Sequence, residues 1–135
     1  MTLDDLKSNI EKTRKITAYA IKSNLGRDYD VEVHKLDWDW STKEGNAILF
    51  TVMFIVEISY ENYGYMEVQE INSFLTEQER AIYKVLDSQK STIGIDGLFG
   101  PRNEEYLIIG PNVDGIDFNA DFFKTRWIVE ITPQP

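Results

Sequence analysis

The sequence predicts an α+β protein with a mainly antiparallel sheet, two long helices on one face of the sheet, and a long projecting β-hairpin. Three observations lead to this fold class. Apolar residues recur at helical spacing in two segments, residues 1–26 and 65–89. Between them, residues 29–60 alternate between apolar and polar side chains, as a hairpin would. Because helices and strands are grouped rather than strictly alternating, we expect antiparallel pairing.

The first helix is predicted over residues 1–26. Thr2 and Asp5 have the spacing of a capping box, and Gly26 is well placed to end the helix in the left-handed conformation. A stripe of apolar side chains, interrupted once by Arg14, marks the face that we expect to be buried: Leu3, Leu6, Ile10, Ala18, Ile21 and Leu25.

The hairpin is predicted over residues 29–60. Trp38 and Trp40 have the opposite parity to the apolar residues before them, which indicates a bulge near Lys35. Ser41 to Asn46 is interpreted as a polar turn. The strand from Ile48 to Tyr60 would extend about 43 Å at ~3.3 Å per residue. We therefore expect it to be buried on both faces over half its length, or to project as an arm. One face is entirely apolar: Ile48, Phe50, Val52, Phe54, Val56, Ile58 and Tyr60.

The second half of the chain is predicted to contain a helix at residues 65–89 and strands and loops at residues 92–132. Thr76 and Glu79 resemble another capping box, so the helix could break near Leu75. Two short strands are expected on either side of a loop, at Thr92 to Asp96 and Tyr106 to Ile109. A long strand is expected from Phe118 to Thr132. Its side chains that should face the core are Phe123, Thr125, Trp127, Val129 and Ile131. All these elements are assigned to one domain, residues 1–135.

Composition narrows the classes of function. The chain of 135 residues has 14 Lys+Arg and 23 Asp+Glu, a net charge of −9, and no cysteine. The acidic balance argues against binding to nucleic acid or anionic membranes. Asp4 and Asp5 occupy positions where a signal peptide would be basic, so we expect no such leader. The apolar run from Ala47 to Val56 is far shorter than the ~20 residues of a membrane span.

We find no pattern typical of catalysis or metal binding, and we expect no enzyme activity, no cofactor and no metal. His34 is the only histidine and is interpreted as an exposed strand residue, without a His pair or His cluster. The Asn and Asp residues between Asn112 and Asp121 do not match the spacing of a calcium loop, and Asp114-Gly115 is typical of a turn. The glycines at 94, 97 and 100 are not followed by a helical pattern and indicate a surface loop.

Two tryptophans at the end of a strand have two interpretations. Trp38 and Trp40 could close the core beneath a helix, which is slightly favoured, or bind a neighbouring subunit. The loop of about ten residues between the strands expected at Thr92 to Asp96 and Tyr106 to Ile109 is long enough to be an interaction arm. The residues that we predict at an interface lie at the hairpin and in this loop: Trp38, Trp40, Lys43, Glu44, Phe99 and Arg102.

The order of elements resembles that of the bacteriophage tail terminator proteins, small α+β proteins of the phage neck. The resemblance lies in the N-terminal helix, the apolar strand from Ile48 to Tyr60, the second helix and the final strand from Phe118 to Thr132. It implies a homo-oligomeric ring, usually a hexamer, that caps the tail tube protein and contacts the head–tail connector proteins. It also implies a virion protein assembled in the cytoplasm of a host bacterium, with no catalytic residues and with DNA only passing through the lumen.

Two other classes of function remain open from the sequence. One is another phage neck, baseplate or injection-machine subunit. The other is an acidic cytoplasmic immunity or inhibitor protein, which would be a monomer with one basic partner. Strong negative charge fits both a conduit that repels DNA and a mimic of a negatively charged substrate.

Overall fold

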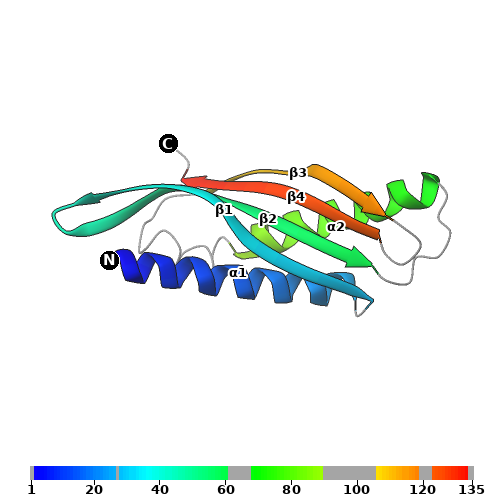
Figure 1. The fold of residues 1–135 in the computed structure, drawn as a ribbon, viewed down its shortest axis with the longest axis horizontal. Helices are drawn as coiled ribbons and strands as arrows, with labels where there is room; N and C mark the ends of the chain where they lie inside the picture. Colours follow the sequence, from blue (N-terminus) through cyan, green and yellow to red (C-terminus); the bar gives the residue numbers. More distant parts are fainter. Residues whose placement is uncertain (1, 27, 61–67, 90–105, 119–122, 134–135) are drawn as a thin grey trace.

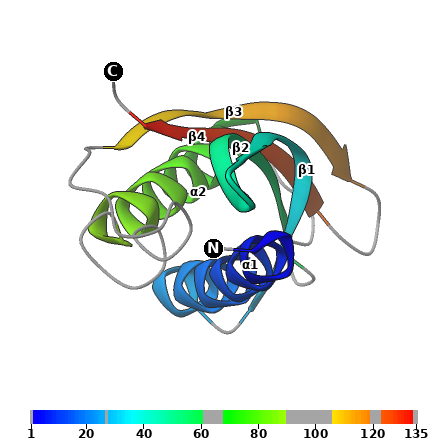
Figure 2. The same cartoon turned by 90° about the vertical axis from the view of Figure 1, so that its left-hand side faces the viewer.

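The computed structural model of the protein describes residues 2–26, 28–60, 68–89, 106–118 and 123–133. Their order is α1 (Leu3–Leu25), β1 (Tyr29–Lys43), β2 (Asn46–Tyr60), α2 (Val68–Ser88), β3 (Tyr106–Phe118) and β4 (Phe123–Pro133). The strands form one antiparallel sheet in the order β1-β2-β4-β3. Figures 1 and 2 show both helices on the same face of this sheet. The predicted α+β class, with a mainly antiparallel sheet, is confirmed.

Helix α1 begins and ends near the predicted residues. The Thr2 hydroxyl accepts a hydrogen bond from the Asp5 amide, and the Asp5 carboxylate accepts one from the Thr2 amide, which completes the capping box. Gly26 follows the helix with a positive φ of 111° but with an extended ψ, so it is not in the left-handed helical conformation expected for it. The buried face includes two threonines that the apolar stripe did not contain: Leu6, Ile10, Thr13, Thr17 and Ile21.

The core lies between the helices and one face of the sheet. Strand β4 contributes its buried face as predicted, with Phe123, Thr125, Trp127, Val129 and Ile131. Helix α2 covers this face with Ile82, Val85 and Leu86, and it buries one polar side chain, Gln78. The Gln78 side-chain oxygen accepts hydrogen bonds from the Thr125 hydroxyl and, at 3.1 Å, from the Trp127 indole. These bonds satisfy the buried Gln78 oxygen, whereas the Gln78 amide nitrogen makes no hydrogen bond within the described residues.

The hairpin contains two bulges. Leu36 is skipped in the register between Lys35 and Asp37, which confirms the bulge predicted near Lys35. A second shift skips Phe50 on β2, so the buried face passes from Val52 to Leu49 and Ala47. The prediction that Ile48 and Phe50 share the face of Val52 is therefore wrong, because the bulge reverses the alternation. Strand pairing continues to Lys43 and Asn46, so the turn is shorter than Ser41 to Asn46.

Three other predictions in the second half are corrected. Helix α2 runs without a break through Leu75, and the Thr76 hydroxyl donates to the Asn72 carbonyl one turn earlier instead of capping a new helix. Strand β3 extends to Phe118 through the segment interpreted as loop and turn, Asn112 to Asp117 included, because its pairing with β4 resumes after two register shifts. The last strand begins at Phe123 rather than Phe118. The expected strand from Thr92 to Asp96 lies outside the described residues.

Neither α1 nor α2, the two helices in the described part of the chain, is long and apolar enough to cross a membrane.

Candidate subunit interface

The closed end of the hairpin has fewer neighbours than the rest of the sheet. Strand β2 pairs with β4 only from Val52 to Tyr60, so residues 46–51 are paired with β1 alone. In Figure 1 this end extends beyond the other strands and beyond the start of α1. The arrangement is compatible with the projecting hairpin that the sequence predicts.

The hairpin turn consists of two residues with positive φ. Glu44 has a φ of 53° and Gly45 a φ of 80°, and positive φ at both central positions is what a type I′ hairpin turn requires. Lys43 and Glu44, two of the predicted interface residues, are exposed here. They are therefore accessible to a partner. Within the described residues, neither side chain forms an ion pair or a hydrogen bond.

Trp38 and Trp40 lie together on the helix-bearing side of the hairpin. Their ring centroids are 5.5 Å apart, and both side chains are half-buried against the edge of the core. The Lys35 ammonium lies 4.1 Å from the centroid of the Trp38 ring, a cation–π contact. The two tryptophans thus contact the core and also retain exposed surface. Phe99 and Arg102, the other predicted interface residues, lie outside the described residues.

A groove of about 350 Å³ lies between α1 and β1 beside Trp38. Its basic side chains are Lys7 and Arg14 from α1 and Lys35 from β1. Ile10 and Trp38 contribute apolar surface, and the groove also contains Glu11 and His34. We name this surface the basic groove. It combines positive charge with an aromatic face in a chain whose net charge is −9.

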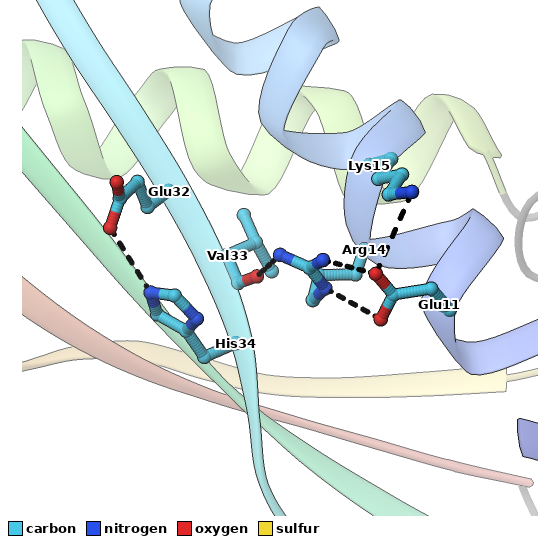
Figure 3. Close-up of polar contacts among 6 residues, drawn as sticks. All are labelled: Glu11, Arg14, Lys15, Glu32, Val33 and His34. Atoms are coloured by element: carbon cyan, nitrogen blue, oxygen red, sulfur yellow. Dashed lines mark hydrogen bonds and ion pairs between the residues drawn. The ribbon is translucent and has the colours of Figure 1, made fainter.

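Arg14 holds the two walls of the basic groove together (Figure 3). Its guanidinium makes two hydrogen bonds to the Glu11 carboxylate on the same helix, and it donates a third, at 3.0 Å, to the Val33 carbonyl of β1. These bonds lower the pKa of Glu11 and raise the pKa of Arg14, so both groups stay charged at neutral pH. The single polar interruption of the apolar stripe on α1 is therefore a contact between helix and sheet.

Two cations of the basic groove have no acidic partner. Within the described ranges, neither Lys7 nor Lys35 forms an ion pair, while Arg14 and Lys15 both contact Glu11. The groove therefore carries more positive charge than its one carboxylate neutralises. Such a surface attracts carboxylates.

The open face of the sheet brings His34 close to two carboxylates. The His34 Nε2 lies 3.2 Å from Glu32, and Glu57 is the direct partner of Glu32 across the ladder. Ligand atoms of the three residues lie within 4.8 Å of one another, a grouping that could hold a cation and that the single histidine did not suggest. Lys124 already contacts Glu57 at 3.0 Å and lowers its pKa. Protein side chains thus compensate this charge, and we assign no metal to the group.

The hairpin end was predicted as an interface from the sequence, whereas the basic groove was not. Lys7 and Arg14 are separated from Lys35 by more than a strand length of sequence, and only the fold brings α1 beside β1. The available signal was Arg14, a charged residue on an apolar stripe. Comparison of the chain with protein-family models and with curated protein sequences finds no match.

Proposed function

We propose that this chain is a structural virion protein of the tail terminator kind, which forms a ring, in the simplest case a hexamer, on the end of a tail tube and joins it to the head connector. The observation that supports this proposal is the hairpin end. It leaves the sheet beyond Val52, exposes Lys43 and Glu44 at its turn, and has the half-buried pair Trp38 and Trp40 at its base.

An arm of this kind suits assembly for a physical reason. The outer residues of β2 have strand neighbours on one side only, so a neighbouring chain can supply the missing contacts. Aromatic side chains with residual exposed surface are common anchors at the centre of interfaces. In a ring, each copy would offer its hairpin to a different surface of the next copy, which is how a closed heterologous assembly forms.

The negative charge is consistent with a conduit. Like charges repel, so a lumen lined by an acidic protein disfavours adhesion of the DNA that passes through it. In this proposal the ring assembles in the bacterial cytoplasm, becomes part of the virion, and stops growth of the tube by covering its end. Its partners are copies of itself, the tube protein and the connector proteins.

The test is the oligomeric mass of the chain, measured by native mass spectrometry and light scattering, alone and with the tail tubes of its phage. We expect sixfold rings, free or bound to tube ends. A chain that stays monomeric in both conditions would refute the proposal, and a stable complex with a single basic protein would favour an inhibitor instead. Rings at another location or of another symmetry would favour a different neck or baseplate subunit.

A shortened hairpin tests the role of the arm. Replacing residues 41–48 by Asn-Gly removes the outer rungs and leaves the pairing of β2 with β4, which begins at Val52, unchanged. We expect a folded chain that no longer assembles. The matched control is Thr42→Ser, which preserves the hairpin length and the residues predicted at the interface and should assemble normally. Equal ring formation by the shortened chain would show that the arm is not needed.

A further inference from the structure

The two outer strands of the sheet differ in the chemistry that they expose. Strands β1 and β3 form opposite edges, with β2 and β4 between them. In Figure 1, β1 lies on the side of α1 and β3 on the far side of the sheet. The basic groove lies at the β1 edge, with Lys7 and Lys35 unpaired within the described ranges.

Strand β3 exposes apolar side chains at its edge. It provides four of the nine exposed large apolar residues in the described part of the chain, with exposed fractions between 43% and 48%: Leu107, Ile109, Val113 and Ile116. Val113 and Ile116 are paired with Trp127 and Thr125, which are buried, so they face the helix side of the sheet without being covered. Leu107 and Ile109 are paired with Thr132 and Glu130 and face the other side of the sheet. Exposed apolar residues along an outer strand are compatible with binding of another chain at this edge.

The same segment of β3 is acidic. Asp114 is exposed, and its carboxylate is 3.9 Å from the Arg126 side chain, at the limit of an ion pair. Asp117 is exposed and faces Lys124 across the ladder, but the Lys124 ammonium binds Glu57 at 3.0 Å. Within the residues that the structure describes, Asp117 has no ion-pair partner. We name residues 113–117 the acidic edge.

The basic groove and the acidic edge complement each other. The groove has three cations against the single carboxylate of Glu11, and the edge has Asp114 and Asp117. Within the described residues, Lys7, Lys35 and Asp117 form no ion pair. They lie at opposite sides of one sheet, so a single molecule cannot join them to each other. Two copies can, and the contact leaves one free groove and one free edge for further copies. A contact between two different surfaces closes into a ring when the rotation per copy permits.

We propose that the basic groove binds the acidic edge of a second copy of this chain, so that Lys7, Lys35 and Arg14 meet Asp114 and Asp117. This inference rests on the ring-forming function proposed above and identifies the surfaces that form the ring. The opposite charges orient the contact.

Charge reversal tests the contact. The groove variant carries Lys7→Glu and Lys35→Glu, and the edge variant carries Asp114→Lys and Asp117→Lys. Each should weaken self-association at least about tenfold, because like charges then face one another. A chain with all four substitutions restores opposite charges and should associate within about threefold of the unmodified chain. The dissociation constant is measured by sedimentation velocity, and melting temperatures confirm that every variant is folded.

The control separates this contact from a general effect of charge. The control variant carries Arg80→Glu and Lys84→Glu on α2. It changes the net charge by the same amount as the groove variant and should leave the dissociation constant unchanged. Failure of the fourfold variant to regain association would overturn the pairing of groove with edge. Unmodified rings that tolerate both reversals would overturn this inference and leave the ring itself standing, whereas a chain that never self-associates would overturn both proposals.

Discussion

At the scale of single residues, Arg14 links the helix layer to the sheet. Val33 is paired with Val56 within the hairpin, yet its carbonyl accepts a hydrogen bond from Arg14. Glu11 orients the guanidinium from the same helix. A carbonyl at the edge of a sheet is a place where another strand could add, so Arg14 both fixes α1 and blocks strand addition at this point of β1.

Replacing Arg14 by Met should lower the free energy of unfolding by about 1 to 2 kcal/mol, because a charge-assisted hydrogen bond to the sheet is lost. Lys15→Met is the matched control. Lys15 is highly exposed and contacts Glu11 only at 3.8 Å, so its loss should change stability by less than about 0.5 kcal/mol. Urea denaturation of both variants measures the two free energies of unfolding. Equal effects would mean that the contact with Val33 contributes nothing.

Glu57 gives a pH dependence whose sign follows from its partner. The hydrogen bond from Lys124 lowers the pKa of Glu57 below its ordinary 4.5. The folded state therefore binds a proton on Glu57 more weakly than the unfolded state does. The stabilisation of the fold by the ionised Glu57 is present above pH 4.5 and is lost as the pH falls through the lowered pKa. In Lys124→Met the loss of stability between pH 5 and pH 3 should be smaller than in the unmodified chain. Thermal unfolding across this range, with Lys84→Met as control, measures the difference; identical slopes would contradict it.

At the scale of the elements, the hairpin shows what alternation can and cannot predict. The bulge at Leu36 was predictable, because charged and apolar residues exchange faces around Lys35. The bulge at Phe50 was not, because both faces of that segment are apolar and a reversal leaves no trace in the sequence. A strand of this composition is recognised easily, but the side chains that it buries are not.

The stability of the hairpin turn can be increased by substitution if the only role of the turn is to reverse the chain. Glu44 has a φ of 53°, a conformation that Asn adopts at lower cost than Glu. Glu44→Asn should therefore stabilise the fold by about 0.5 to 1 kcal/mol, and Gly45→Ala should destabilise it by about 1 kcal/mol, because Gly45 has a φ of 80°. Urea denaturation of the two variants checks both signs. A loss of stability in Glu44→Asn would mean that the Glu44 side chain makes a contact of its own.

Strand β3 was the least predictable element. Asn112, Asp114 and Gly115 are typical turn residues, yet they lie within a strand with two register shifts opposite β4. Pairing with a long, strongly apolar neighbour overrides these local preferences, and this long-range effect has no signature in a short window of sequence. The acidic edge was therefore assigned to a loop, and one half of the proposed contact between copies was not visible before the fold.

At the scale of the whole molecule, the proposed self-association has to be compatible with the charge of −9. Copies of a strongly acidic chain repel one another over about one Debye length, roughly 8 Å at physiological salt. A ring therefore needs local contacts in which opposite charges meet and apolar groups are buried. The basic groove supplies the positive side, since Lys7 and Lys35 are not neutralised within the described residues. The distribution of charge thus matters more for assembly than its sum.

Trp127 and Trp38 are expected to differ in their effects on folding and on the proposed assembly. Trp127 is 2% exposed and donates a hydrogen bond to Gln78, so Trp127→Ala should cost about 3 to 5 kcal/mol of stability. Trp38 is half-buried at the margin of the core and lines the basic groove, so Trp38→Ala should cost about 1 to 2 kcal/mol yet abolish ring formation. Melting temperature and oligomeric mass, measured on the same samples, distinguish the two roles. If Trp38→Ala destabilises the chain as much as Trp127→Ala, Trp38 belongs to the core and the interface must lie elsewhere on the hairpin.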